Sequence, residues 1–497
     1  MPRLTASRVV VAVVAVAAAL TLVSCSSGKD EDAVPNLRQG QRPNIVFVLA
    51  DDFSRNLVRY MPEVQKMEKD GVSFSNYFVT NSLCCPSRAT TFTGELPHNT
   101  GIFSNGGNDG GWAAFHSRGE QKSTFATSLQ GAGYRTALFG KYLNKYPARG
   151  KLGPKGARGG PVPPGWSQWA VATNGYASYN YWLNVNGRPE WHGKRPQDHI
   201  TSQIATRGTQ FINDSVRMNK PFMLELAPFA PHLPATPEPQ DAKKYDSLEA
   251  PRNPNFNEAD MKDKPLWLKN HRKLSKKWIR DLDRQFRNRV RSVQAVDRMI
   301  GNLRAQLKAK GIAKNTYVVF ASDNGLHLGE HRLRQGKLTT FDIDIHVPLI
   351  AVGPKIKAGR TEDALTANTD LCPTFIDMAR SKQLSKGDGQ SLMPLLTGQK
   401  GWKNRSAVLI EHHGPDLDRS DPDVPLIGSG NPPSYEAIRT LNETYTQYAD
   451  GEREYYNIKK DPYELDNTWG KLKPAERLRL ANLVRDLQHC KGKNCIR

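Results

Sequence analysis

The sequence predicts an α/β fold in which helices cover both faces of a large, mostly parallel sheet. Five short apolar runs are typical of strands buried on both faces of such a sheet. They are residues 44–50, 134–139, 221–226, 316–321 and 347–352. Segments with helix signals alternate with loops between these runs, and this alternation favours a sheet with helices on both sides.

Three segments between the runs carry helix signals. The first is a short helix that ends near Gly94, because Pro86 suits an early helical position and glycine suits a helix exit. The second covers residues 123–130, which begin with capping residues and end before a glycine. The third is a long amphipathic helix from residue 274 to about residue 310, with Arg and Lys on its solvated face.

After about residue 400 the predicted elements change to short strands and turns, followed by a final helix. The strands are expected at residues 406–410, 435–440, 444–448 and 454–457, and the helix at residues 475–489. We therefore predict a main domain, residues 42–400, and a smaller C-terminal α+β subdomain with an antiparallel sheet, residues 401–497. Residues 147–164 and 241–273 lack periodicity and are expected to be surface loops.

The composition points to an anionic partner. The chain has 497 residues and a formal net charge of +21, which a nucleic acid, an anionic glycan or a cell envelope could balance. No zinc-finger, RRM-like or homeodomain-like pattern is present, so we expect no nucleic-acid partner.

The N-terminus has the features of an export signal. Basic residues precede an apolar run, residues 9–23, that is too short for an ordinary membrane span. Residues 22–25, Leu-Val-Ser-Cys, resemble a bacterial lipobox. This implies a lipoprotein signal peptide, residues 1–24, a lipid on Cys25 and a flexible tether, residues 25–41. We expect a protein anchored by lipid alone to the outer face of a bacterial membrane. The alternative is a plain secretory signal and a secreted protein.

The cysteines fit an exported protein. Cys490 and Cys495 would close a short loop in an oxidising compartment, so we predict a disulfide between them. Cys84 and Cys85 are neighbours, which rarely bridge each other. One of them stands at the entrance of the first predicted helix, where backbone N–H groups favour an anion, and Arg88 follows one turn later. A buried structural cysteine pair is the alternative.

Oxygen ligands follow two of the predicted strands. Asp51 and Asp52 come directly after the first strand, and Asp323 and Asn324 come after the fourth. Ligands of open α/β sheets bind beyond the carboxyl ends of the strands, so we expect these side chains to lie close together. Their oxygens suit Ca²⁺ or Mg²⁺. For the two aspartates that follow the first strand, helix capping is the alternative.

Cationic groups are expected at the same edge of the sheet. Lys141 and His232 follow the second and third strands, and Lys337 lies in the loop before the fifth. Together with Arg88 they would surround a tetrahedral anion with positive charge and hydrogen-bond donors.

Residues 84–88, Cys-Cys-Pro-Ser-Arg, and the following Thr93-Gly94 match the signature Cys-x-Pro-Ser-Arg of type I sulfatases. The chain resembles this family, within the alkaline-phosphatase-like superfamily, from residue 44 to residue 467. The family oxidises the first cysteine of the signature to Cα-formylglycine, which implies that a formylglycine-generating enzyme modifies Cys84 and that Cys85 is the variable position. The resemblance favours Ca²⁺ over Mg²⁺. The implied metal ligands are Asp51, Asp52, Cys84, Asp323 and Asn324.

The resemblance implies a mechanism of sulfate ester hydrolysis. One hydroxyl of hydrated formylglycine at Cys84, acidified by the metal, would attack the sulfur. The metal and the cations Arg88, Lys141 and Lys337 would offset charge on the sulfuryl oxygens, and a lysine or His232 would protonate the leaving alcohol. Loss of a proton from the second hydroxyl would expel sulfate and restore the aldehyde. A cysteine thiolate lacks that hydroxyl.

Several segments are similar to N-acetylglucosamine-6-sulfatases and heparan 6-O-endosulfatases, which implies a sulfated amino sugar or anionic glycan as substrate. These segments are residues 83–88, 97–99, 140–144, 230–232 and 322–327. His327 would contact the substrate or have a structural role. Leu143 replaces a histidine of many arylsulfatases, as in the glucosamine-6-sulfatase-like group. Glu95 stands where Lys or Arg is usual, so we expect one positive charge fewer near the site.

Two other functions are compatible with these features. A phosphonate monoester or phosphodiester hydrolase is the nearest alternative, because the same superfamily and cysteine motif serve both chemistries. A lipid-anchored protein that binds anionic glycans without turnover is the other. The oxidisable Cys84 argues against a mere binder, which has no need of it.

Overall fold

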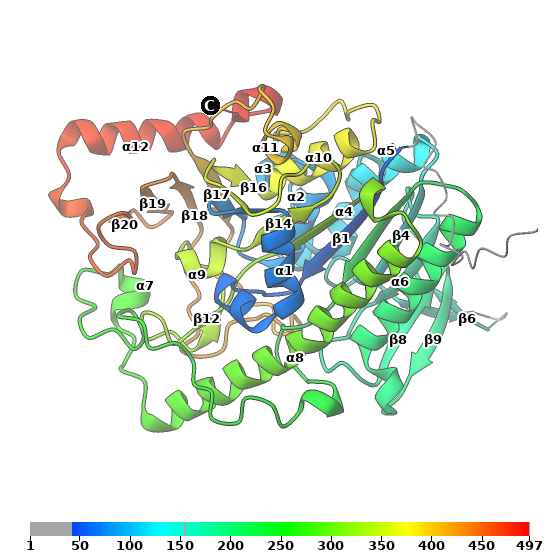
Figure 1. The fold of residues 1–497 in the computed structure, drawn as a ribbon. Coiled ribbons are helices and arrows are strands. Elements are labelled where there is room, and N and C mark those ends of the chain that lie inside the picture. The colour runs from blue at the N-terminus through cyan, green and yellow to red at the C-terminus, as the bar shows by residue number, and fades with distance from the viewer. Residues whose placement is uncertain (1–41, 154–155, 497) are drawn as a thin grey trace, which may run out of the picture. The chain divides into compact units, whose positions relative to one another are not determined.

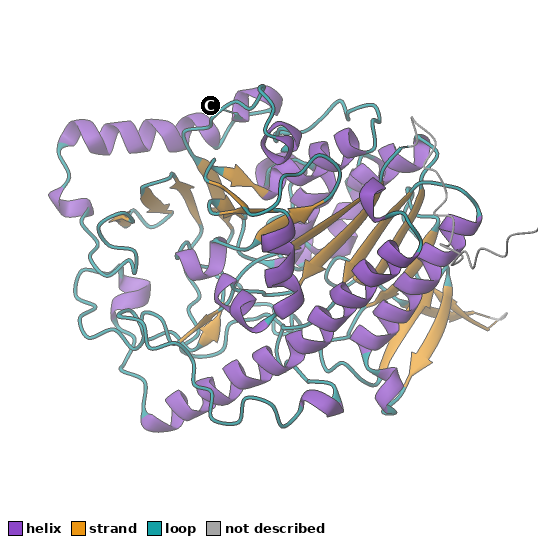
Figure 2. Ribbon diagram, viewed as in Figure 1, coloured by secondary structure: helices purple, strands orange, loops and turns teal. Residues whose placement is uncertain are grey.

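The centre of the fold is a ten-stranded mixed sheet, seen in a computed structural model that describes residues 42–153 and 156–496 (Figures 1 and 2). In spatial order its strands are β15 (Arg360–Glu362), β2 (Val72–Phe74), β14 (Leu349–Val352), β11 (Thr316–Ser322), β1 (Asn44–Ala50), β10 (Phe222–Ala227), β4 (Arg135–Lys141), β7 (Gln168–Ala172), β8 (Tyr181–Val185) and β9 (Arg188–His192). The predicted large sheet is confirmed.

The central strands, from β11 through β1, β10 and β4 to β7, run parallel. The flanks differ, because β14 runs antiparallel to β11 and β2, and β8 runs antiparallel to β7 and β9. The direction of β14 cannot be predicted from its residues. An apolar strand buried on both faces shows the same pattern whichever way it runs.

Alternate side chains of β1 enter two different hydrophobic cores. The odd-numbered side chains, from Ile45 to Leu49, pack in the first core, and the even-numbered ones, from Val46 to Ala50, pack in the second. The helices that contribute to the first core include α2 (Cys84–Thr93), α5 (Phe125–Gly131) and α10 (Leu371–Met378). Those of the second core include α1 (Pro62–Asp70), α6 (Ile200–Arg217) and α8 (Lys276–Ala309). Helices therefore cover both faces of the sheet, as predicted.

Helix α2 begins at Cys84, so Pro86 lies in its first turn. The backbone N–H groups of that turn have no intrahelical partner, and the N–H that proline lacks therefore costs no hydrogen bond. It ends at Gly94, which has a left-handed backbone (φ 77°) and donates its N–H to the Thr90 carbonyl. The remaining α-helices before the C-terminal sheet are α3 (Pro97–Thr100), α4 (Gly111–Ser117), α7 (Leu266–Lys269), α9 (Asp342–Ile345) and α11 (Met393–Thr397).

The C-terminal strands β17 (Val408–His412), β18 (Tyr435–Arg439), β19 (Glu443–Tyr448) and β20 (Arg453–Asn457) form an antiparallel sheet. The apolar face of α12 (Pro474–Leu487) shares a core with this sheet, in which Leu480 packs with Leu409 and Ile438. A disulfide joins Cys490 to Cys495 just after α12. The described residues form a single compact unit, and the domain boundary near residue 400 stays a prediction.

Several short strands were not expected. The segment predicted as a surface loop contains the hairpin of β5 (Arg149–Gly153) and β6 (Gly156–Gly159). Two further pairs are β3 (Tyr77–Phe78) with β16 (Thr366–Ala367) and β12 (His327–Leu328) with β13 (Gln335–Gly336), and the last of these strands leads directly into Lys337. The signal peptide, Cys25 and the tether lie outside the described residues. Among the helices that the structure describes, none has both the length and the apolar composition needed to cross a membrane.

Candidate active site

Two pairs of oxygen ligands meet at the carboxyl end of the parallel strands. Strands β1 and β11 are in register up to their last residues, so Asp51 and Asp52 lie beside Asp323 and Asn324. The backbone N–H of Asp52 donates to Asp323 Oδ1 (3.0 Å), and Asn324 Nδ2 donates to Asp52 Oδ1 (2.7 Å). Asp52 has a left-handed backbone (φ 59°), a strained conformation of the kind that clusters at active sites.

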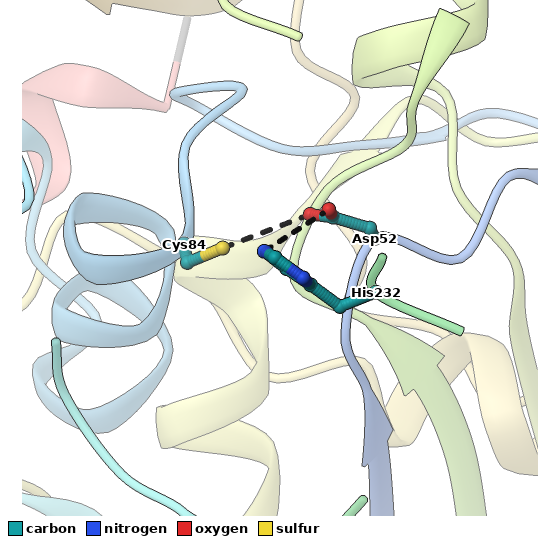
Figure 3. A group of neighbouring side chains, drawn as sticks. All are labelled: Asp52, Cys84 and His232. Atoms are coloured by element: carbon teal, nitrogen blue, oxygen red, sulfur yellow. Dashed lines mark hydrogen bonds and ion pairs between the residues drawn. The ribbon is translucent and has the colours of Figure 1, made fainter. Parts of the chain in front are cut away.

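Cys84 is the first residue of α2 and reaches the same place. Its Sγ lies 3.3 Å from Asp51 Oδ1 and 3.7 Å from Asp52 Oδ1, and Figure 3 shows the thiol pointing toward Asp52 and His232. Cys85 packs in the first hydrophobic core instead. The structure therefore distinguishes the two neighbouring cysteines, and only Cys84 faces the charged cluster.

Two lysines contact this cluster from different elements. Lys141 is the last residue of β4, and its Nζ lies 2.8 Å from both carboxylate oxygens of Asp51. Lys337 follows β13, and its Nζ lies 2.7 Å from Asp52 Oδ1 and 2.9 Å from Cys84 Sγ. Both amino groups are thus held at the thiol by carboxylates.

Arg88 and His232 complete the positive side of the site. Arg88 Nε donates to Asp323 Oδ2 (2.7 Å), whereas its Nη2 is buried without a hydrogen-bond partner among the described residues. His232, five residues beyond β10, has its Nδ1 2.7 Å from the Leu233 carbonyl and its Nε2 3.6 Å from Asp52 Oδ2. Arg88 Nη2 lies 3.9 Å from Asp51 Oδ1, too far for a hydrogen bond, so this N–H can donate to an anionic ligand.

Burial and neighbouring charges set the protonation of the site. Burial raises the pKa of the Cys84 thiol well above its usual range, and the lysines only partly oppose this, so the unmodified side chain is a neutral thiol at neutral pH. Burial lowers the pKa of Lys337, but the attraction of Asp423 and Asp52 outweighs it and keeps the pKa well above the usual range. Lys141 behaves in the same way beside Asp51. Both lysines are therefore charged.

The donor set fits a divalent cation. Four buried ligand atoms lie within 4.8 Å of one another, one each from Asp51, Asp52, Cys84 and Asp323. Beside them Asn324 Oδ1 is buried and has no hydrogen-bond partner in the described part of the chain, an acceptor that a bound cation would satisfy. Because carboxylate and amide oxygens predominate, the group suits Ca²⁺ or Mg²⁺ better than a soft metal.

One member of the cluster was missed in the sequence. Asp423 lies in the loop of residues 413–434 that connects β17 to β18, and its Oδ1 is 2.5 Å from His232 Nε2 and 2.9 Å from Lys337 Nζ. Its Oδ2 accepts a hydrogen bond from Asn105 Nδ2 (2.9 Å). The loop follows no motif, and Asp423 is one of several aspartates in it. An acidic stretch is the only signal, and it does not say which carboxylate reaches the site.

The hydrogen bonds of His327 favour a positioning role over the expected contact with substrate. Its Nδ1 lies 2.9 Å from Asp344 Oδ2, and its Nε2 lies 2.8 Å from the Ser429 carbonyl. Both ring nitrogens are therefore engaged by the protein. Since Ser429 belongs to the same loop as Asp423, the histidine ties one end of that loop to the two-stranded sheet of β12 and β13.

The position of Glu95 corrects an expectation from the sequence. Glu95 follows Gly94 at the far end of α2, and a ten-residue helix separates it from Cys84 by roughly 15 Å. Glu95 is buried near Glu120, and burial raises its pKa to about 7. The unusual acidic residue therefore removes no positive charge from the neighbourhood of the thiol.

Comparisons with known proteins agree with this geometry. The family model described as "Sulfatase" matches residues 43–381, and the model described as "N-sulphoglucosamine sulphohydrolase, C-terminal" matches residues 329–491. The N-acetylglucosamine-6-sulfatase of Homo sapiens is 33% identical over 482 residues, which cover 92% of this chain and 86% of that protein. An extracellular sulfatase SULF-1 homolog of Drosophila melanogaster is 33% identical over 392 residues, 76% of this chain and 34% of that protein.

A solved structure has the same fold. It is that of BT4656 in complex with its substrate D-glucosamine-2-N,6-O-disulfate, with a TM-score of 0.73, 23% sequence identity, and coverage of 90% of this chain and 98% of that one. The family match spans most of the chain, and the predicted resemblance is confirmed. The chain belongs to the sulfatase family and is a sulfuric ester hydrolase.

Proposed function

We propose that the protein hydrolyses the sulfate ester of a glucosamine-6-sulfate-like amino sugar, free or within an anionic glycan. The observation that carries this proposal is the position of Cys84 Sγ, 3.3 Å from Asp51 Oδ1 and 2.9 Å from Lys337 Nζ. A neutral, buried thiol is a poor nucleophile there, but the position is right for a modified residue that shares a cation with carboxylates. The choice of sugar is supported by the 33% identity to N-acetylglucosamine-6-sulfatase.

Two groups beyond the unmodified chain belong to this proposal. Cys84 is converted to formylglycine by a formylglycine-generating enzyme, and the hydrated aldehyde supplies the attacking hydroxyl and a second hydroxyl for release of sulfate. A divalent cation, for which we propose Ca²⁺, supplies Lewis-acid stabilisation of the sulfuryl oxygens. The residues that would hold it are Asp51, Asp52, Asp323, Asn324 and the modified residue 84.

The remaining charged groups have distinct roles. Arg88 Nη2 and the amino groups of Lys141 and Lys337 offset the negative charge that grows on the sulfuryl oxygens, in a buried site where such interactions are strong. Lys337 stands beside the thiol and therefore beside the attacking atom. We assign the proton of the leaving alcohol to His232, which lines a cavity of about 220 Å³ together with Lys337 and Asp52.

The charge state of His232 supports this assignment. Burial lowers its pKa, but Asp52 and Asp423 outweigh the effect and raise it above the usual range. In the substrate-free site the imidazole therefore carries the proton that a leaving alcohol requires.

The N-terminal residues support an exported protein. We propose that the signal peptide is removed and that Cys25 carries a lipid, because Leu-Val-Ser-Cys at residues 22–25 resembles a lipobox. Mass spectrometry of the mature protein from its native host should then find Cys25 as the N-terminal residue with a lipid on it. A mature N-terminus elsewhere, or an unmodified Cys25, would contradict the anchor.

The function is tested with protein made in a host that supplies the formylglycine-generating enzyme. Steady-state rates on N-acetylglucosamine-6-sulfate and on paired aryl sulfate and aryl phosphodiester substrates should favour the sulfates. Peptide mass spectrometry should find formylglycine at residue 84 in the active material. A strong preference for the phosphodiester would contradict the substrate, and unmodified thiol throughout the active protein would contradict the nucleophile.

A further inference from the structure

The carboxylate of Asp423 occupies the position that an anionic ligand of this site requires. Its Oδ1 takes hydrogen bonds or ion pairs from His232 Nε2 (2.5 Å) and Lys337 Nζ (2.9 Å). Its Oδ2 accepts from Asn105 Nδ2 (2.9 Å) and lies 3.6 Å from Cys84 Sγ. The carboxylate is therefore an anion held by cationic donors beside the atom at which the reaction starts.

The same donors are those assigned above to the sulfate ester. Lys337 also has the carboxylate of Asp52 as a partner at 2.7 Å, so release of Asp423 does not leave the lysine without a counter-ion. A sulfuryl oxygen and the Asp423 carboxylate cannot share Lys337 and His232, because two negative charges in contact within a buried site repel each other strongly. Substrate binding must displace Asp423.

The loop that carries Asp423 is built to allow this displacement. The Asp423 loop, residues 413–434, contains no helix and no strand. Large apolar side chains on it face solvent instead of a core, with exposed fractions of 76% for Leu417, 59% for Leu426 and 90% for Ile427. A segment that buries so little apolar surface opens at low cost.

Hydrogen bonds close the base of the loop, whereas its middle is held by side-chain contacts such as the ion pair of Lys145 with Asp418. Asp416 N–H donates to Asn431 Oδ1 (2.8 Å), and Asn431 Nδ2 donates to the Asp416 carbonyl (2.7 Å). His327 holds the Ser429 carbonyl at 2.8 Å. These bonds close the base of a compact surface loop, so the segment around Asp423 can move without disturbing β17 or β18.

We propose that Asp423 is an internal competitor of the substrate: without substrate its carboxylate holds Lys337 and His232, and productive binding requires the loop to release it. This inference rests on the proposed roles of those two residues in binding the sulfuryl group. Asp423 thereby determines which anions bind. A small anion such as product sulfate must displace Asp423 without any other contact to the loop, whereas a larger glycan can also contact the loop as it moves.

The consequence is a lowered apparent affinity in the native protein. Apparent dissociation constants rise in inverse proportion to the fraction of molecules in the open state. If about one molecule in ten is open, Asp423→Asn should lower the KM for an aryl sulfate and the inhibition constant for inorganic sulfate about tenfold. The value of kcat should stay within about twofold, because Asp423 is absent from the productive complex.

The experiment compares the modified wild-type enzyme with Asp423→Asn and Asp423→Ser. Asp418→Asn is the control, because Asp418 lies on the same loop but pairs with Lys145 away from the thiol, and its constants should equal those of the wild type. Tighter sulfate binding by both Asp423 variants in titration calorimetry supports the proposal. Unchanged or weaker sulfate binding by both variants, or a raised KM, overturns it and makes Asp423 a spectator or a substrate contact.

The binding measurement also separates this inference from the proposed function. Calorimetry with inorganic sulfate needs no turnover, so it reports on Asp423 even if the enzyme does not act on amino sugars. Conversely, a wild type that cleaves no sulfate ester contradicts the proposed function. The effect of Asp423 on sulfate binding is then still decided by calorimetry.

Discussion

The strand-end cluster, which comprises Asp51, Asp52, Lys141, Asp323 and Asn324, and the Asp423 loop meet at the same thiol but are held in place differently. The cluster continues from the parallel strands β1, β4 and β11, whose backbone hydrogen bonds fix its direction. The loop is anchored at its base and has no regular structure between. The difference indicates that the sheet fixes the chemistry of the site, whereas the loop controls which anion reaches it.

Loss of a carboxylate should cost more stability in the strand-end cluster than in the Asp423 loop. Each buried cation of the site has a carboxylate partner: Lys141 has Asp51, Arg88 has Asp323 and Lys337 has Asp52. Removal of one partner leaves an uncompensated buried charge, which is strongly destabilising. Loss of the Asp423 carboxylate still leaves Lys337 with a partner, so substitutions in the loop should change affinity more than stability.

The largest expected effect concerns the thiol. Cys84→Ala should reduce kcat at least about 10³-fold, because the residue that we propose as the precursor of the nucleophile is lost. Cys85→Ala, one residue away, should keep its activity within a few-fold, since Cys85 packs in the apolar core and not against the charged cluster. The variant should lose a little stability, because the substitution removes one buried sulfur atom from that core. Rates on an aryl sulfate and thermal unfolding of both variants test the pair. Equal losses of activity would show that both cysteines belong to the chemistry.

Removal of the cation comes next. Chelation should lower activity by about 100-fold or more and also lower the unfolding temperature, and Ca²⁺ should restore both, because a ligand that binds only the folded state stabilises it. Asn324→Ala should weaken the Ca²⁺-dependent stabilisation, whereas Asp423→Asn should leave it unchanged. Thermal unfolding against Ca²⁺ concentration measures this. A weaker Ca²⁺ response in Asp423→Asn would make the loop part of the metal site.

A smaller effect is expected for Glu225 on β10. Its carboxyl is buried, and neither oxygen has a hydrogen-bond partner among the residues that the structure describes. Burial raises its pKa to about 8, and Arg88 opposes this only in part. In the unfolded chain a glutamate has a pKa near 4.3, so between about pH 4.3 and 8 only the unfolded state loses the proton. Stability then falls with rising pH, by up to about 1.4 kcal/mol per unit.

Glu225→Gln should therefore gain stability relative to the wild type as the pH rises through this window, and the gain should level off above about pH 8. Thermal unfolding of both proteins at several pH values measures the difference, and kcat at neutral pH serves as the control because the neutral acid resembles the amide. A difference that does not change with pH would mean that the carboxylate is ionised and paired in the folded protein.

The smallest effect is expected at Glu95. Glu95→Lys restores the charge usual in the family but, at roughly 15 Å from Cys84 along α2, it should change kcat/KM less than about twofold. The values of kcat/KM of both proteins are compared at physiological ionic strength. A several-fold gain in kcat/KM would show that charge at the far end of α2 does reach the site.

The sequence by itself determined β1, β4, β10, β11 and β14 of the ten-stranded sheet, and the polar residues that follow the first four of them. Residues 44–50 are an apolar run followed directly by Asp51-Asp52, and residues 316–321 are one followed after Ser322 by Asp323-Asn324. The carboxyl ends of parallel strands meet at one edge of the sheet. Strand order and the antiparallel direction of β14 were not predictable, because burial on both faces erases the pattern that would reveal them.

Only the tertiary structure decided between Cys84 and Cys85 on physical grounds, since it directs one thiol to the carboxylates and the other into a core. It also revealed Asp423, more than 300 positions after Cys84 in the chain. It showed that Glu95 lies at the far end of α2 and not at the site. The reason is the same in each case. Local sequence encodes where a strand or helix begins and ends, but the place that a loop or a helix end reaches depends on packing between distant elements.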